Sequence, residues 1–212
     1  MNNRDGRSLG TLGFTCATLL LLMGRLSVCG ADPQTVAMTA GAHQQFMGGE
    51  RRRTNVNYAI PNVTLRREDG IAVGLPKELD DGRPVIVNFI FTSCTSICPM
   101  SSQTLALLQE RLGKDRDRVH IVSVSIDPEQ DSPQRLHEYA QHFNAGKSWH
   151  FYTGSLTDSV VVQRAFDVYR GEKMAHTAVT LMRSAPGKGW VRFDGYVSAD
   201  ELYAELEGDR QL

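Results

Sequence analysis

The chain has 212 residues, 41% hydrophobic and 22% charged, which is enough to bury one full hydrophobic core. Its formal net charge of -1 gives the chain no strong positive field. Nucleic acid and anionic membrane surfaces, which such a field attracts, are therefore not expected as partners. We therefore expect one globular domain whose function depends on individual side chains.

The N-terminus differs from the rest of the chain. Two arginines precede an apolar run over residues 9–23, and small residues follow at positions 29–31. This order is typical of a secretory signal, and the run is shorter than the ~20 residues that cross a bilayer. We interpret residues 1–31 as a signal peptide or membrane-targeting segment, with a permanent anchor or lipidation at Cys29 as alternatives. The domain is then expected in the periplasm or on the extracytoplasmic face of a bacterial inner membrane, with membrane contact through the N-terminus at most.

The next segment, residues 32–56, has no sustained periodicity and predicts a flexible tether that includes Arg51-Arg52-Arg53. The pattern changes from residue 57 onward. Short strands are predicted over 63–65 and 71–73, separated by a turn. We therefore place the folded domain at residues 57–212.

A buried central strand is predicted at Val85 to Phe91, because this run is β-branched, aromatic and almost uninterrupted. Strands and helices alternate after it: a helix over 99–112, a strand over 119–126, a helix from Ser132-Pro133, a strand over 149–152, a helix over 155–169, strands over 178–182 and 191–196, and a helix after the capping box at 198–201. This order predicts an α/β fold with a central mixed sheet flanked by helices.

Two cysteines belong to the predicted domain, since Cys16 and Cys29 lie in the export segment. Cys94 and Cys98 are only four residues apart, so a disulfide between them would close a loop too short to stabilise the fold much. They follow a buried strand and open a helix, where α/β sheets place their sites and a helix N-terminus favours thiolates. The spacing is wider than Cys-x-x-Cys, which favours metal binding over purely redox chemistry.

A stable site for a soft metal ion needs a third ligand besides Cys94 and Cys98. The candidates are Met100, Met174 and the histidines. Most histidines lie in the tether or in predicted strands and helices, where solvent or a hydrogen bond satisfies them: His43, His120, His137, His142 and His150. His176 instead precedes a strand, in the loop that thioredoxin-like folds bring beside such a cysteine turn. Two thiolates and an imidazole suit copper, whereas structural zinc normally takes four protein ligands.

At this point the chain resembles the Sco/SenC family of copper chaperones for cytochrome oxidase assembly, over residues 57–207. The family's Cys-x₃-Cys-Pro element is matched by Cys94 to Pro99, its Asp-Pro-Glu-x-Asp-(Ser/Thr)-Pro element by Asp127 to Pro133, and its distal histidine by His176. The resemblance implies a thioredoxin-like fold and one copper ion bound by the two cysteines and the histidine. It also implies delivery to the oxidase subunit that carries the CuA centre, reduction of that subunit's cysteines, and an upstream copper donor or thiol reductant.

Other functions could use the same residues. One is a metal-independent thiol-disulfide oxidoreductase, in which one cysteine attacks and the other resolves. A peroxiredoxin is suggested by Thr95 to Pro99, but Phe91 occupies the position of the proline such sites need upstream. A copper carrier for a different acceptor would have the same ligands. In every copper hypothesis the redox state gates binding, because a Cys94–Cys98 disulfide and a metal ion compete for the same sulfurs.

Overall fold

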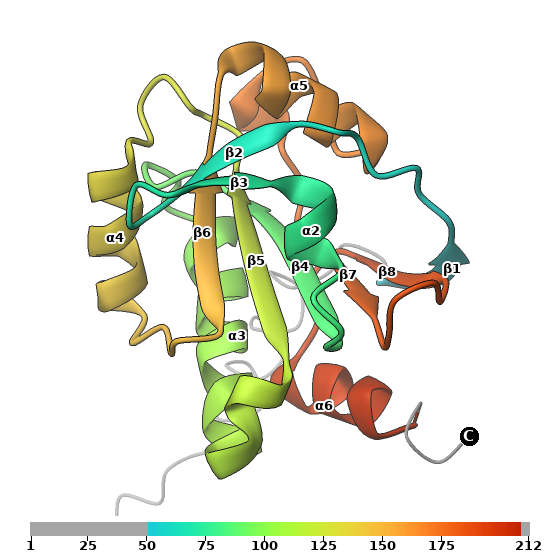
Figure 1. The fold of residues 1–212 in the computed structure, drawn as a ribbon. Helices are drawn as coiled ribbons and strands as arrows, with labels where there is room; N and C mark the ends of the chain where they lie inside the picture. The colour runs from blue at the N-terminus through green and yellow to red at the C-terminus, as the bar shows by residue number, and fades with distance from the viewer. Residues whose placement is uncertain (1–50, 209–212) are drawn as a thin grey trace, which may run out of the picture. The chain divides into compact units, whose positions relative to one another are not determined.

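The structure is a computed structural model and describes residues 51–208. Its centre is an eight-stranded mixed sheet with the order β1-β8-β7-β4-β5-β6-β2-β3 (Figure 1). The strands are β1 (Arg52–Val56), β2 (Thr64–Arg67), β3 (Ala72–Gly74), β4 (Val85–Ile90), β5 (His120–Ser125), β6 (Trp149–Thr153), β7 (Val179–Arg183) and β8 (Trp190–Asp194). The predicted export segment and residues 32–50 of the predicted tether lie outside the described residues.

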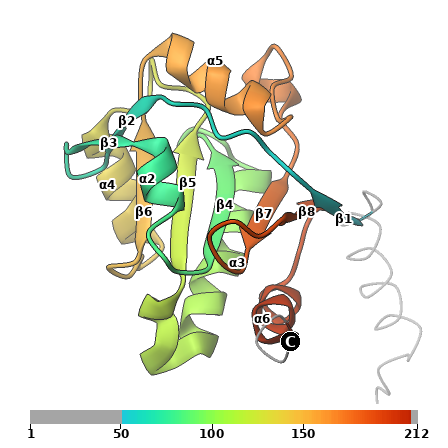
Figure 2. The same cartoon turned by 45° about the vertical axis from the view of Figure 1, so that its right-hand side comes forward.

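Strand β4 is at the middle of the sheet and is buried at all six positions. It pairs in parallel with β5 and antiparallel with β7, and β5 pairs in parallel with β6. Figure 2 shows β7 and β8 extending the sheet from β4 to the edge strand β1. A strand covered on both faces requires apolar side chains at successive positions, which explains the hydrophobic run, interrupted only by Asn88, that predicted it.

Helices cover both faces of this sheet, as the sequence predicts. In Figure 1, α3 lies behind the sheet and α2 in front of it, and α6 packs against α3. Among the helices of residues 51–208, none has the length and apolar composition needed to cross a bilayer. The helices are α2 (Leu75–Leu79), α3 (Ile97–Leu112), α4 (Pro133–His142), α5 (Leu156–Ala165) and α6 (Ala199–Gly208), with 3₁₀ turns η1 (Gly113–Arg118) and η2 (Lys173–Ala175).

Local signals in the sequence set several helix ends. Ser132 caps α4, and its hydroxyl accepts a backbone N–H one turn into the helix. The predicted capping box of α6 is formed, because the Glu201 carboxylate accepts the Ser198 N–H at 2.9 Å and the Ser198 hydroxyl accepts the Glu201 N–H at 3.2 Å. Helix α3 ends at Gly113, whose φ of 57° is easily adopted only without a side chain.

The sequence predicts a tether to residue 56, but Arg52–Val56 forms strand β1, antiparallel to β8. Polar and charged residues predominate in β1, so no apolar alternation marks it as a strand. Its position depends on long-range contacts: Arg51 pairs with Glu201 at 2.6 Å, and Arg53 pairs with Glu205 at 2.6 Å. The domain therefore begins earlier than the sequence indicates.

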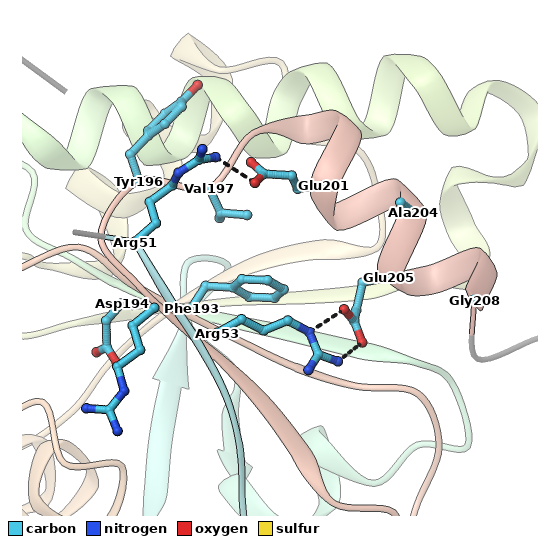
Figure 3. A pocket seen from close by; sticks show the side chains of 11 residues that line it. Arg51, Arg53, Phe193, Asp194, Tyr196, Val197, Glu201, Ala204, Glu205 and Gly208 are labelled. Carbon is cyan, nitrogen blue, oxygen red and sulfur yellow. Dashed lines mark hydrogen bonds and ion pairs between the residues drawn. The ribbon is translucent and has the colours of Figure 1, made fainter. Parts of the chain in front are cut away.

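A pocket of about 740 Å³ lies between β1, β8 and α6 (Figure 3). The ion pairs Arg51–Glu201 and Arg53–Glu205 bridge it, as the dashed lines in Figure 3 show. None of the side chains lining it is a cysteine or a histidine. The pocket is therefore crossed by two ion pairs, and the predicted metal ligands do not line it.

Candidate metal centre

The two cysteines lie where β4 leads into α3. Cys94 is in the turn after the strand, and its backbone N–H donates to the Phe91 carbonyl at 3.1 Å. Cys98 is in the first turn of α3, and its side chain is 1% exposed, while Cys94 is half-buried. Both are free thiols. Cys94 precedes the helix, so the helical repeat does not relate it to Cys98. The turn between β4 and α3 brings the two sulfurs together instead.

The two sulfurs differ strongly in acidity. Burial raises the pKa of the Cys94 thiol, but hydrogen bonds from Ser96 and Cys98 to its sulfur outweigh burial, so its pKa lies below the usual value of 9.0. Burial raises the pKa of the Cys98 thiol well above its usual range, and the nearby Cys94 and Asp131 add to the effect. The turn therefore holds one accessible thiol biased toward thiolate and one buried thiol biased toward the protonated form.

A buried carboxylate supports this turn. The Asp131 side chain is 0% exposed and accepts the Thr92 N–H at 3.2 Å, the Thr92 hydroxyl at 2.6 Å and the Ser125 hydroxyl at 2.6 Å. It thus ties the segment before Cys94 to the end of β5. The sequence marks Asp131 only as part of the Asp127 to Pro133 element. Its position in the sequence could have identified it as part of the site, since it follows a strand that ends at the same sheet edge as the cysteine turn.

His176 lies at that same edge of the sheet. It precedes β7, and β7 runs antiparallel to β4 with Thr180 opposite Asn88, so β7 begins where β4 ends. The ring Nε2 is 3.1 Å from the Phe89 carbonyl oxygen. Since a carbonyl only accepts, this contact assigns the proton of a neutral ring to Nε2 and leaves the Nδ1 lone pair free. Burial lowers the pKa of His176, which favours the neutral, ligating form.

The three predicted ligands are not gathered into a finished site. Within residues 51–208, no three His, Cys, Asp or Glu side chains are close enough to hold a metal ion. Cys94 and Cys98 are in contact, whereas His176 lines a separate cavity of about 270 Å³ beside α5. A three-ligand site would therefore require the loop that carries His176 to move toward the sulfurs.

The remaining histidines have other surroundings. His150 Nδ1 is 2.8 Å from Glu68, His120 Nδ1 is 3.1 Å from Asp81, and His137 contacts a neighbouring glutamine on α4 at 3.0 Å. His142 packs its ring edge-on against Phe143, and His43 lies outside the described residues. Met100 is half-buried in α3, and Met174 in η2 is 78% exposed.

Comparison with known proteins adds independent information. The family described as SCO1/SenC matches residues 68–208 of this chain. The SCO1 protein homolog of Bacillus subtilis is 34% identical over 121 residues, which cover 55% of this chain and 62% of that protein. The matched part thus spans less than two thirds of that relative.

Solved structures are also similar. Arabidopsis thaliana ScoI with copper bound is 31% identical with a TM-score of 0.60, and the match covers 73% of this chain and 100% of that one. Bradyrhizobium japonicum ScoI with copper bound is 26% identical with a TM-score of 0.60, and the match covers 70% of this chain and 98% of that one. These similarities confirm the predicted thioredoxin-like α/β fold.

Proposed function

The chain belongs to the SCO1/SenC family, and from this premise we propose that it is a copper chaperone for the CuA centre of a respiratory cytochrome oxidase. Its cargo is one copper ion, bound by Cys94, Cys98 and His176. The observation that carries the proposal is the thiol pair in contact at the end of β4, with a neutral imidazole at the same sheet edge. Two relatives of similar fold have been solved with copper bound.

The chemistry of these side chains suits this cargo. Thiolates are soft ligands that prefer Cu(I), and imidazole makes Cu(II) acceptable as well. Cys94 is more accessible and has the lower pKa, so it contacts the incoming ion first. Cys98 must lose its proton before it binds, so copper loading releases a proton. His176 then completes the site through its free Nδ1 lone pair, once its loop has moved toward the sulfurs.

The same thiols provide a second activity, reduction of an acceptor disulfide. The Cys94 thiolate attacks one acceptor sulfur, forms a mixed disulfide and releases the other acceptor sulfur as a thiolate. Cys98 then loses its proton and attacks Cys94, which gives a Cys94–Cys98 disulfide and the second acceptor thiol. The acceptor gains two electrons, and the oxidised chaperone has no free thiolate for copper. A thiol reductant must restore it before a copper donor reloads it.

The place of action follows from the predicted export segment. We propose that the domain works in the periplasm or on the extracytoplasmic face of a bacterial inner membrane, and contacts that membrane at most through its N-terminus. Its partners there are the oxidase subunit that carries CuA, a copper donor and a thiol reductant. A metal-independent thiol-disulfide oxidoreductase is the alternative, since the contact between the two sulfurs serves that chemistry equally well.

Metal binding by the purified, reduced full-length chain tests the proposal. We expect one copper per chain and a sulfur-to-copper charge-transfer band after Cu(II) is added. Cys94→Ser and Cys98→Ser should each abolish that band, and His176→Ala should weaken copper binding by about tenfold or more through loss of one ligand. His142→Ala is the control, because that exposed ring lies on α4 and contacts Phe143.

Two outcomes would contradict the proposal. Unchanged copper affinity in His176→Ala would exclude the three-ligand site. Retention of stoichiometric copper after verified Cys94–Cys98 disulfide formation would exclude redox-gated binding. Transfer of copper from the loaded chain to a purified CuA domain then separates this chaperone from a carrier for another acceptor.

A further inference from the structure

We propose that Lys173 is a positioning residue for the copper site, and that its ion pair with Asp127 keeps the His176 loop close to the cysteine turn, so that the loop needs less movement to bring His176 to the sulfurs. The His176 loop is defined here as residues 166–178, between α5 and β7. This inference rests on the proposed function and identifies a residue that controls the same site.

The contacts of Lys173 connect three segments. Its ammonium donates to the Asp127 carboxylate, and the two side chains are 39% and 9% exposed respectively. The same ammonium lies 5.7 Å from the centroid of the Phe91 ring, a cation–π distance. Phe91 is where the cysteine turn starts, since its carbonyl accepts the Cys94 N–H. Lys173 therefore joins the His176 loop to both the end of β5 and the base of the cysteine turn.

The His176 loop has little apolar packing near its tip. All three residues of η2 are exposed, and Met174 within it is 78% exposed. Segments with few buried apolar contacts open at low free-energy cost, so polar contacts decide where such a loop rests. Near the tip of this loop those contacts include the Lys173–Asp127 pair and the His176 contact with the Phe89 carbonyl.

The partner of Lys173 is well anchored. The Asp127 carbonyl accepts the backbone N–H groups of Gln130 and Asp131 at 3.0 and 2.9 Å. Asp131 in turn holds Thr92, in the segment that leads to Cys94. The short segment 127–131 thus contacts both parts of the site. Asp131 holds the cysteine turn, and Asp127 holds the His176 loop. The separation between the ligands therefore depends on the Lys173–Asp127 pair.

The decisive comparison uses Lys173→Gln, which removes the charge and leaves a polar side chain that is one atom shorter. Lys147→Gln is the matched control, because Lys147 forms an ion pair with Asp117 at 3.0 Å on a different part of the surface. Copper affinity is measured on the reduced full-length chain by competition with a chromophoric Cu(I) chelator. The charge-transfer band after Cu(II) addition reports the ligand geometry.

We expect Lys173→Gln to lower copper affinity about fivefold, the lower end of typical coupling between linked sites. Its charge-transfer band should shift toward that of His176→Ala. Lys173→Arg should have the copper affinity and the charge-transfer band of the wild type, because it keeps the positive charge. Asp127→Asn should lower copper affinity as Lys173→Gln does. The double variant should bind copper no more weakly than the weaker-binding single variant, since both substitutions remove the same ion pair. Lys147→Gln should match the wild type.

The outcomes separate this inference from the proposed function. If the wild type binds no copper, or binds it equally well without the cysteines, the proposed function fails. If the wild type binds copper and His176→Ala weakens binding, but Lys173→Gln matches Lys147→Gln or binds more tightly, only the role of Lys173 is overturned. A loss of affinity that Lys173→Arg does not restore would also overturn it.

Discussion

The cysteine turn and the His176 loop meet at one edge of the sheet but are built very differently. The turn joins a fully buried strand to a long helix, and the buried Asp131 carboxylate holds its backbone. The tip of the His176 loop has an exposed 3₁₀ turn, and its contacts with the rest of the site edge include a charge pair and one ring contact. The thiols are therefore held by buried contacts, whereas the tip of the loop that carries the imidazole is exposed. This difference suits a carrier that captures its cargo with sulfur and closes or opens the site with histidine.

The largest expected effect concerns the support of the cysteine turn. Asp131→Ala should lower the free energy of unfolding by about 3 kcal/mol, because Thr92 and Ser125 lose their buried acceptor. Urea denaturation measures this loss. The control is Asp115→Ala, whose half-exposed carboxylate lies 3.8 Å from Arg118 and should matter by less than about 0.5 kcal/mol. Equal stability of the two variants would show that the turn does not depend on Asp131.

A smaller effect should distinguish the two sulfurs within the turn. In the reduced native protein, Cys94 should react with iodoacetamide at least about tenfold faster than Cys98, because it is more exposed and its pKa is lower. Its rate should rise with pH and reach half its maximum below pH 9. Mass spectrometry of labelled peptides gives both rates. In urea the two rates should converge, and native rates that are already equal would contradict the assigned asymmetry.

The smallest effect should be on the stability of the His176 loop. His176→Ala removes one hydrogen bond to the Phe89 carbonyl, so the free energy of unfolding should fall by only about 1 kcal/mol. The same variant should still weaken copper binding. We therefore expect a large effect on copper affinity and a small effect on the free energy of unfolding. His142→Ala serves as the baseline in thermal unfolding. A loss as large as that of Asp131→Ala would show that the His176 loop supports the fold as strongly as the cysteine turn does.

Much of the fold could be predicted because its signals are local. The hydrophobic run of β4, the Ser132 cap of α4 and the capping box of α6 each lie within a few residues. Strand β1 was missed because its polar side chains form no apolar pattern, and its pairing partner β8 is more than 100 residues away. Helix α2 was missed because its five residues are too few to show a helical period.

The amino-acid sequence was enough to predict the fold class and to single out the cysteine pair, since both depend on residue type and on spacing along the chain. The three-dimensional contacts were needed to show that Cys94 is the more acidic thiol, that Asp131 holds the cysteine turn and that Lys173 pairs with Asp127. The reason is physical: acidity depends on burial and on hydrogen-bond donors, and ion pairs depend on distances between residues far apart in the chain. For His176, the sequence indicated the sheet edge, and the structure showed that its ring is not grouped with the two sulfurs within residues 51–208.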